Sequence, residues 1–454
     1  MIDIQNTLID YTLFTKYDRN YFVNNLILPI YEDEISFKVA VCKESRLDSI
    51  KKDFNKLIKF IEIDKLDIEF ILSNLDKKIN LYIYALKIFN NKNIEDSSII
   101  DFFYSLLQFS INQRASDIHI EEYGKNLQFR FRIDGRLKTF FIFDADFSKV
   151  LFSYIKLLSN LDITQTRLPM DSRFSLEIED KTFDFRVSTM PTISSESVVI
   201  RILDKKNVNK SLETLGLSLD LLEILKKALH LTQGLILLSG PTGSGKTTTL
   251  YSILKELKSN DKKIITVEDP VEYKIDSISQ IAVNTKVGMS FDLILKNILR
   301  QDPDIIFIGE IRDKFSLDIA LQASLTGHLV IATVHASSAI QTISRLIDLK
   351  ADPFLISSTL KLIMAQRLVL NYCQSCNFKG CKQCNFTKYY DRSSIAEILK
   401  IDDEISSMIF KKSDISEIKR YLETIDFKTL LCDGKEKVSQ NITSIEEVYK
   451  VVNI

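Results

Sequence analysis

The stretch LILLSGPTGSGKTTTLYSILK, residues 235–255, decides the fold. It opens with an apolar run of strand length, Leu235–Leu238, and continues into GPTGSGKT at 240–247. This segment fits the pattern GxxxxGK[ST] at every fixed position, and a helical pattern over Thr247–Lys258 follows it. A strand, a glycine-rich loop and a helix in this order predict a phosphate-binding loop.

Glycine is scarce in this chain, with 12 among 454 residues, against about 7% in an average protein. Three of the twelve, Gly240, Gly243 and Gly245, lie in the loop, so a chance glycine turn is a weak alternative. We expect Lys246 to reach the β- and γ-phosphates and Thr247 to bind Mg²⁺. The residues expected to bind the nucleotide are Gly240, Pro241, Thr242, Gly243, Ser244, Gly245, Lys246, Thr247 and Thr248.

Beyond the loop, apolar runs of strand length alternate with helical patterns. Strands are expected at Ile264–Val267, Ile305–Ile308 and Leu329–Thr333, and helices at Phe291–Arg300 and Ser316–Leu325. This alternation predicts a parallel α/β sheet of the RecA-like kind.

Acidic side chains follow two of the expected strands. Glu268, Asp269 and Glu272 come after the first, and Glu310 follows the next. Ligands bind at the carboxyl ends of strands in such sheets, and a phosphate-loop enzyme needs carboxylates for Mg²⁺ and for water. Solvated loop charges are the alternative, but two such clusters downstream of one phosphate loop favour a catalytic role.

Two of the four histidines flank one apolar run in TGHLVIATVHA, residues 326–336. A lone histidine is usually structural. Because His328 and His335 lie seven residues apart around a strand, we expect the pair to lie near the γ-phosphate.

The chain is long enough for several domains. Residues 1–95 are expected to form a small α/β domain and residues 96–207 an α+β domain. A nucleotide-binding domain over 208–454 follows, which is expected to include the cysteine segment 373–384 and a C-terminal helical module. The polar stretch Asn90–Ser98 is the expected linker. Other expected elements are the apolar runs Phe22–Ile30 and Phe37–Val41, helices at Leu47–Ile61 and Leu66–Leu75, strands at Leu127–Ile133 and Phe183–Val187, and a mostly helical segment after Leu370.

Four cysteines form two CxxC pairs within CQSCNFKGCKQC: Cys373, Cys376, Cys381 and Cys384. Four thiolates can close a tetrahedral zinc site, and the four-residue spacer predicts a compact knuckle over 373–384. An iron–sulfur cluster and redox or incidental thiols are the alternatives. Cys42 and Cys432 are expected to be buried apolar residues.

Composition and charge limit the classes of protein. The net charge of −1 argues against a large basic surface for nucleic acid. No run approaches the 18 or so apolar residues that span a bilayer. The start MIDIQNTLIDYTLF does not resemble a signal peptide. We therefore expect a cytoplasmic protein that meets a membrane only through partners.

Together these segments resemble the secretion-superfamily ATPases of type II secretion and type IV pilus assembly. The resemblance covers nearly the whole chain, and its motifs are in the family's order. They are RASDIHIE (114–121), FRIDGRL (131–137), RLPMDSR (167–173), RVSTMPT (186–192), the phosphate loop, ITVEDPVEY (265–273), LRQDPDIIFIGEIRD (299–313), TGHLVIATVHA (326–336), the four cysteines and DGKEKVSQNITSIEEVYKVV (433–452).

The resemblance implies an ATP hydrolase and a role for each matching residue. Beside Lys246 and Thr247, Glu272 is the general base that polarises the attacking water. Glu310 positions Mg²⁺ and its waters, and His335 senses the γ-phosphate. Two arginines, Arg186 and Arg201, reach the nucleotide, often across a subunit interface. Arg173 is a weaker candidate of this kind, and surface ion pairs are the alternative for these arginines.

The chain departs from the family at several turns. Met170 and Ser172 stand where the family has Gln and Gly, and Ser195 stands at another usual glycine. Asp426 and Asn441 also replace glycines. Because Asn and Asp tolerate left-handed backbone, we expect the last two turns to survive. Ser172 is the doubtful position, since it adjoins Arg173.

The resemblance also implies a fold and partners. It predicts a RecA-like domain preceded by a PAS-like α+β domain, in a homo-hexamer at the inner face of the cytoplasmic membrane. The ring would drive an inner-membrane platform protein that adds pilin subunits. The first domain, through the strand pattern LPIYEDEISFKVAV (28–41), would dock on the cytoplasmic domain of an inner-membrane adapter.

Several functions remain open at this point. The motor could serve type II secretion, pilus assembly or DNA uptake. A pilus-retraction or DNA-processing motor is disfavoured, because such motors typically lack the four cysteines. From another class, a zinc-containing nucleic-acid-binding protein with an ATPase domain is the alternative.

Overall fold

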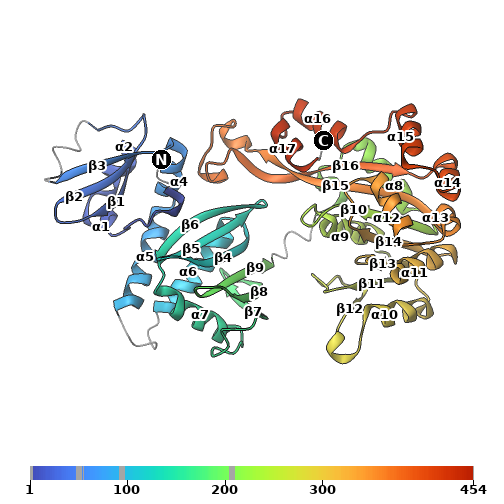
Figure 1. The fold of residues 1–454 in the computed structure, drawn as a ribbon, viewed down its shortest axis with the longest axis horizontal. Helices are drawn as coiled ribbons and strands as arrows, with labels where there is room; N and C mark the ends of the chain where they lie inside the picture. The colour runs from blue at the N-terminus through green and yellow to red at the C-terminus, as the bar shows by residue number, and fades with distance from the viewer. Residues whose placement is uncertain (1–3, 48–53, 55, 91–97, 204–209, 453–454) are drawn as a thin grey trace. The chain divides into compact units, whose positions relative to one another are not determined.

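The computed structural model describes residues 4–47, 54, 56–90, 98–203 and 210–452, and the predicted linker lies mostly outside them (Figure 1). Contacts divide the chain into two compact units. The first comprises residues 1–204 with 373–390, and the second 205–372 with 391–454. Among the described residues, no helix combines the length and the apolar character needed to cross a bilayer.

A three-stranded sheet, in the order β1-β2-β3, forms the start of the first unit. Its strands are β1 (Ile27–Glu32), β2 (Ser36–Val41) and β3 (Leu57–Glu62), beside helices α1 (Leu13–Lys16), α2 (Arg19–Asn25), α4 (Lys65–Leu72) and α5 (Leu75–Asn90). The helix predicted over Leu47–Ile61 is wrong at its end, where β3 runs parallel to β2. The apolar spacing of LIKFIE fits the period of a helix as well as that of a strand. The segment forms a strand because it pairs with the edge of β2.

An antiparallel sheet of six strands follows, in the order β6-β5-β4-β9-β8-β7. The predicted strands lie within β5 and β8, so the α+β prediction is confirmed for this part. The elements are α6 (Ser98–Asn112), β4 (Ala115–Tyr123), β5 (Asn126–Ile133), β6 (Arg136–Asp144), α7 (Phe147–Leu158), β7 (Met170–Ile178), β8 (Lys181–Pro191) and β9 (Glu196–Leu203).

The second unit is built on a seven-stranded sheet in the order β12-β11-β13-β14-β10-β15-β16. The pairs from β12 to β15 are all parallel, as predicted. The elements around the sheet are α8 (Leu219–Leu229), β10 (Gly234–Ser239), α9 (Lys246–Leu257), β11 (Ile264–Glu268), β12 (Ser279–Ala282), α10 (Phe291–Ile298), β13 (Ile305–Ile308), α11 (Lys314–Leu325), β14 (Leu329–Val334), α12 (Ala339–Asp348), α13 (Pro353–Thr359), β15 (Leu360–Tyr372) and β16 (Tyr389–Lys400).

Both faces of this sheet are covered by helices (Figure 1). Leu235 and Leu237 of β10 pack in a core with α10, α11 and α12. Ile236 and Leu238 face the other way, into a core with α8 and α9. Successive strand residues therefore meet opposite layers, and this explains why the strand beside the phosphate loop is apolar throughout.

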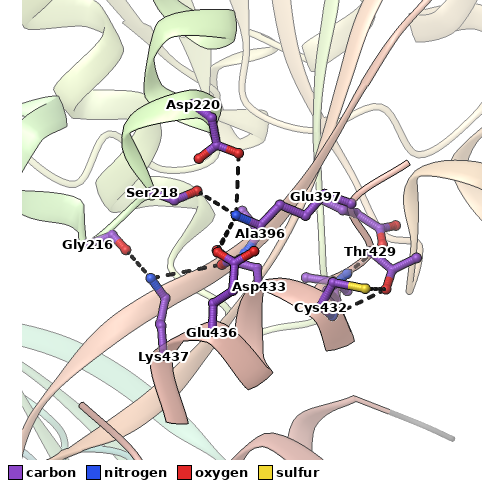
Figure 2. Close-up of polar contacts among 12 residues, drawn as sticks. Gly216, Ser218, Asp220, Ala396, Glu397, Thr429, Cys432, Asp433, Glu436 and Lys437 are labelled. Atoms are coloured by element: carbon purple, nitrogen blue, oxygen red, sulfur yellow. Dashed lines mark hydrogen bonds and ion pairs between the residues drawn. The ribbon is translucent and has the colours of Figure 1, made fainter. Parts of the chain in front are cut away.

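Four helices end the chain: α14 (Asp403–Phe410), α15 (Ile415–Thr424), α16 (Leu430–Ser439) and α17 (Ile445–Val451). They confirm the helical prediction, although β16 before them was not predicted. Buried carboxylates attach α16, as Figure 2 shows. Glu397 of β16 accepts from the Leu430 amide (3.0 Å), and Asp433 accepts from the Ala396 amide (2.9 Å). Burial raises the pKa of both carboxyl groups.

The cysteine segment belongs to the first unit. Lys138 Nζ donates to the Asn385 carbonyl at 3.1 Å, and the Arg114 guanidinium lies 3.7 Å from the centre of the Tyr390 ring. Phe386 packs against the hydrophobic core of this unit. The segment is thus covalently continuous with β15 and β16 and packed on residues of the N-terminal part.

Candidate nucleotide and metal sites

The phosphate loop connects β10 to α9, as predicted. Gly243 and Gly245 have φ of 79° and 90°, and Gly240 has φ of 152°. A Cβ on Gly240 would lie 2.4 Å from Ser244 Oγ and 2.8 Å from the Gln366 carbonyl oxygen. Glycine is therefore required there by a close approach as well as by backbone conformation.

The lysine of the loop is held by the loop itself. Lys246 Nζ donates to the carbonyls of Gly240 and, at 3.0 Å, Pro241. Burial lowers the pKa of Lys246, and the nearby Glu310 charge opposes this effect. A second support comes from β15, where the buried Gln366 donates through Nε2 to the Ser244 carbonyl at 2.8 Å. The sequence analysis did not find Gln366.

Predicted residues from four loops meet in one cavity of about 620 Å³. Glu310, at the end of β13, accepts from Arg312 Nε at 2.8 Å and lies 2.9 Å from His335 Nε2. Thus the Glu310 and His335 side chains, predicted separately, are in direct contact. The predicted residues that line the cavity are Pro241, Thr242, Gly243, Ser244, Gly245, Lys246, Thr247, Thr248, Glu268, Asp269, Glu272, Glu310 and His335.

The second histidine is not part of this site. His328 lies before β14 and His335 after it, so about six residues of strand separate them, on the order of 20 Å. The His328 ring contacts the Ala323 carbonyl through Nδ1 at 3.0 Å. The predicted histidine pair is therefore wrong, because only the carboxyl end of a parallel strand faces the site.

Two side chains of the last strands also line the cavity and were missed. Leu368 of β15 and Arg392 of β16 bring an apolar surface and a guanidinium to it. Arg392 Nε is buried without a hydrogen-bond partner among the described residues. Only a prediction of β16 could have pointed to Arg392, since no local motif marks it.

The predicted arginines form a row across the antiparallel sheet of the first unit. Arg173, Arg186 and Arg201 are direct neighbours in register on β7, β8 and β9. Arg201 Nε donates to Asp117 Oδ1 of β4 at 2.8 Å, and all four residues line a shallow cavity of about 400 Å³. The row thus places three guanidinium groups side by side in a cavity that also contains the Asp117 carboxylate.

The residues that depart from the family pattern have backbone conformations and hydrogen bonds that the structure accommodates. Asp426 and Asn441 adopt φ of 49° and 54°, so these glycine replacements take the expected left-handed conformation. The Ser172 hydroxyl donates to the Ser159 carbonyl, which links β7 to the end of α7. Ser195 closes the turn before β9 through its carbonyl, which accepts from the Thr192 amide at 2.9 Å.

The four cysteines of the knuckle converge. Their Sγ atoms all lie within 4.8 Å of one another, with 3.8 Å between Cys373 and Cys381 and 4.0 Å between Cys376 and Cys384. A tetrahedral ion with metal–sulfur bonds of about 2.3 Å places its sulfurs about 3.8 Å apart. The set therefore fits a single tetrahedral ion, and burial raises the pKa of the Cys373 thiol to about 12.

The knuckle is made of two turns of the same sequence form. CQSCNF and CKQCNF each give a short 3-10 helix followed by left-handed Asn and Phe. All six cysteines lie in the described residues and are free thiols. Cys42 is buried as predicted, whereas Cys432 is exposed on α16, so its predicted burial is wrong.

Comparison with known proteins gives the family context. The sequence profile of the family described as "Type II/IV secretion system protein" matches residues 92–450. Type II secretion system protein E of Klebsiella pneumoniae is 38% identical over 435 residues, covering 89% of this chain and 87% of that protein. Type II secretion system ATPase E of Vibrio cholerae is 40% identical over 382 residues, covering 79% and 76%.

Two solved structures are similar in fold. The Legionella pneumophila ATPase DotB aligns with a TM-score of 0.62 and 23% identity, covering 77% of this chain and 95% of its own. The pilus retraction motor PilT with bound ADP aligns with a TM-score of 0.56 and 26% identity, covering 77% and 97%. Both similarities support the phosphate-loop fold found here.

Proposed function

The chain belongs to the family of type II/IV secretion system proteins and is an ATPase of that family; we propose that it is the motor that powers assembly of a pseudopilus or pilus. The observation that carries this proposal is the cavity in which Lys246, Glu310 and His335 meet beside the phosphate loop. The type II secretion relatives at 38–42% identity favour type II secretion among the systems that assemble such fibres.

The residues present fit MgATP. Lys246 and the loop amides would hold the β- and γ-phosphates, and Thr247 would bind Mg²⁺, which neutralises charge developing on the phosphates. Glu310 would position the ion's waters, and its contact with His335 puts an imidazole beside the same carboxylate. Glu272, which lines the cavity, is the proposed general base toward the attacking water.

The arginine row is the proposed partner of the nucleotide charge. Arg186 and Arg201 would stabilise the transferring phosphoryl group from the antiparallel, PAS-like domain, across the interface of a homo-hexamer. Three cations in register on neighbouring strands, which line one cavity, support this role.

The knuckle is a proposed zinc site. Two closely spaced CxxC turns with sulfurs at tetrahedral separation support Zn²⁺ with Cys373, Cys376, Cys381 and Cys384 as its ligands. With four protein ligands and no open position, the ion would hold the fold of the knuckle and take no part in hydrolysis.

The membrane partners are proposed from the family. The ring would act at the inner face of the cytoplasmic membrane on a platform protein. The small N-terminal domain, whose β1–β2 pair matches the predicted strands, would dock on the cytoplasmic domain of an adapter. Direct binding of nucleic acid is not part of the proposal, given the net charge of −1.

A retraction motor remains the alternative within the same chemistry. The solved retraction motor is 26% identical to this chain, whereas the type II secretion relatives reach 38–42%. The four-cysteine element also favours assembly. A zinc-containing nucleic-acid-binding protein is less favoured, because the catalytic carboxylates and the phosphate loop are intact.

ATP turnover of the purified full chain tests the enzymatic part. Lys246→Ala should abolish nucleotide binding, and Glu272→Gln should retain MgATP but lose at least about a hundredfold in turnover. Glu256→Gln, on the exposed face of α9, is the matched control and should hydrolyse ATP normally. Normal turnover by Glu272→Gln would refute the base assignment.

Mixed rings test whether the arginines act between subunits. Arg186→Ala and Lys246→Ala chains should each be inactive. If each arginine serves the neighbouring subunit's nucleotide, mixing the two chains creates some sites with both residues intact, and turnover should return. No recovery in rings shown to be mixed would contradict action across the interface.

A further inference from the structure

The carboxylate at the last residue of β11 is buried, and both of its oxygens accept hydrogen bonds. Glu268 is 5% exposed, and its Oε2 accepts the Tyr251 hydroxyl at 2.6 Å. Its Oε1 accepts from the Thr266 hydroxyl at 2.6 Å and from Gln280 Nε2 at 3.2 Å. Because three donors from α9, β11 and β12 converge on it, this carboxylate serves as an anchor.

The Tyr251 hydroxyl has a second set of contacts. The backbone amides of Glu272 and Tyr273 both approach it as donors at 3.3 Å. Burial raises the pKa of Tyr251, so the hydroxyl stays protonated and can donate to Glu268 while it accepts from these amides. One side chain therefore joins the buried anchor to the segment that carries Glu272.

Gln280 of β12 holds the next residues of the same segment. Its Nε2 donates to the Tyr273 carbonyl at 2.8 Å, and its Oε1 accepts from the Ile275 amide at 2.6 Å. Gln280 lies opposite Thr266 in the parallel pair of β12 and β11. Residues 272–275 are thus tied on one side to α9 and on the other to the sheet edge, although they form no helix or strand.

The placement of Tyr251 on α9 gives this network a direct relation to the phosphate loop. Thr247 and Tyr251 are four residues apart on one helix, so they share a face. The helix starts at Lys246. The same rigid element therefore presents the phosphate-binding residues at its N-terminus and, one turn later, the hydroxyl that contacts the Glu272 amide.

We propose that Tyr251 and Gln280, anchored on Glu268, are positioning residues that hold Glu272 in line with the nucleotide bound at the start of α9. The inference rests on the proposed role of Glu272 as the general base. It assigns Glu268 a structural part in catalysis: this carboxylate acts through the tyrosine and the glutamine that it anchors.

Tyr251→Phe is the first test, since it removes one oxygen and keeps the ring. The kcat of the full chain should fall about tenfold or more, because a slight misplacement of a catalytic group is costly. The KM for ATP and the affinity for a non-hydrolysable analogue should stay within about twofold of the original values. Tyr421→Phe, which removes a hydroxyl that donates to Asp402 at 2.7 Å, is the matched control and should leave kcat unchanged.

Gln280→Met provides the second test and remains usable if Tyr251→Phe does not fold. It removes both bonds to the segment at 273–275 with little change of volume, and should produce the same fall of kcat at constant KM. A joint loss of kcat and nucleotide affinity in either variant would overturn the proposal, because it would place the defect in the phosphate loop.

A double-mutant comparison separates this inference from the base assignment. In the Glu272→Gln background, single-turnover hydrolysis should be insensitive to Tyr251→Phe, because the group being positioned is gone. An equal fall in both backgrounds would overturn the positioning role and leave the base assignment intact. Normal hydrolysis by Glu272→Gln alone would instead refute the base assignment and, with it, this inference.

Discussion

The phosphate loop and the cysteine knuckle both contain tight turns with left-handed backbone, but this conformation is adopted mainly by different residue types in the two sites. The loop uses Gly243 and Gly245 at φ of 79° and 90°. The knuckle uses Asn377 and Asn385 at φ of 44° and 49°. Of the 12 glycines of the chain, three thus lie in the phosphate loop and one, Gly380, in the knuckle.

Crowding explains the use of glycine at Gly240 and Gly245, but not at Gly243, where no atom lies within 4 Å of an added Cβ. A Cβ on Gly245 would lie 3.0 Å from Gln366 Nε2, and one on Gly240 would collide with Ser244. Within the knuckle, glycine occurs at Gly380, where a Cβ would approach Leu66 Cδ2 to 3.1 Å. Glycine is therefore required by a close approach at Gly240 and Gly245, whereas asparagine supplies the left-handed conformation at the exposed position Asn377.

The two sites also differ in the sign of their charge. Burial lowers the pKa of Lys246 in the loop and raises the pKa of Cys373 in the knuckle to about 12. Desolvation therefore favours the neutral form in both places. A ligand of opposite charge restores the charged form, an anion at the loop and a cation at the knuckle.

The largest effect is expected from Gly240→Ala. Its Cβ cannot fit without moving Ser244 or the β15 backbone, so nucleotide binding should be lost, as measured by titration with a fluorescent ATP analogue. Gly124→Ala is the matched control, because Gly124 has φ of 62° with no atom within 4 Å of the added Cβ. It should cost about 1–2 kcal/mol of stability and leave ATP binding intact. Normal ATP binding by Gly240→Ala would show that crowding does not select glycine here.

The second-largest effect is expected from the removal of one thiol of the knuckle. Cys376→Ser is expected to lose the bound zinc, because a tetrahedral site with three thiolates and a hydroxyl binds it far more weakly. Zinc content by atomic absorption checks this, with Cys432→Ser as the control outside the cluster. Full zinc content in Cys376→Ser would mean that the ion has other ligands.

The third-largest effect is expected from a fall in pH, which should weaken zinc binding by the knuckle. Zinc binds thiolates, and burial raises the pKa of Cys373 to about 12, so binding must release protons near neutral pH. Affinity should therefore fall as the pH falls, by about tenfold per unit for each proton released. Competition with a chelator at several pH values measures this slope. Zinc affinity that does not change with pH would contradict thiol ligands.

The contrast between the sites also shows what could be predicted from the sequence. The turn between β10 and α9 and the convergence of the four cysteines could be predicted because the residues of each lie within a few positions of one another. β13 was predicted to the residue, since an apolar run between polar turns is a local signal. The six-stranded sheet placed Arg186 and Arg201 side by side, which sequence spacing alone does not show.

Most of the failures concern residues whose position depends on the three-dimensional arrangement of the strands and not on the local sequence. Leu57–Glu62, which was predicted to belong to a helix, forms β3 because it pairs with the edge of β2. His328 and His335 were predicted to lie together, but β14 separates them by its whole length. Gln366 and Arg392 come from strands far along the chain from the loop that they support, so no motif contains them.

The smallest and most discriminating test exchanges the left-handed residue of the knuckle. Asn377 is exposed, so Asn377→Gly changes only the backbone and should alter the thermal stability of the zinc-bound protein by less than about 0.5 kcal/mol. Asn377→Ala should cost about 1 kcal/mol, because alanine lacks the local hydrogen bonding that lets asparagine tolerate φ of 44°. Thermal unfolding at saturating zinc measures both.

The reverse exchange, Gly240→Asn, should abolish ATP binding, because the obstacle there is the collision with Ser244. If Asn377→Ala were as harmless as Asn377→Gly, left-handed backbone would not be what selects asparagine, and the contrast between the two sites would reduce to crowding alone.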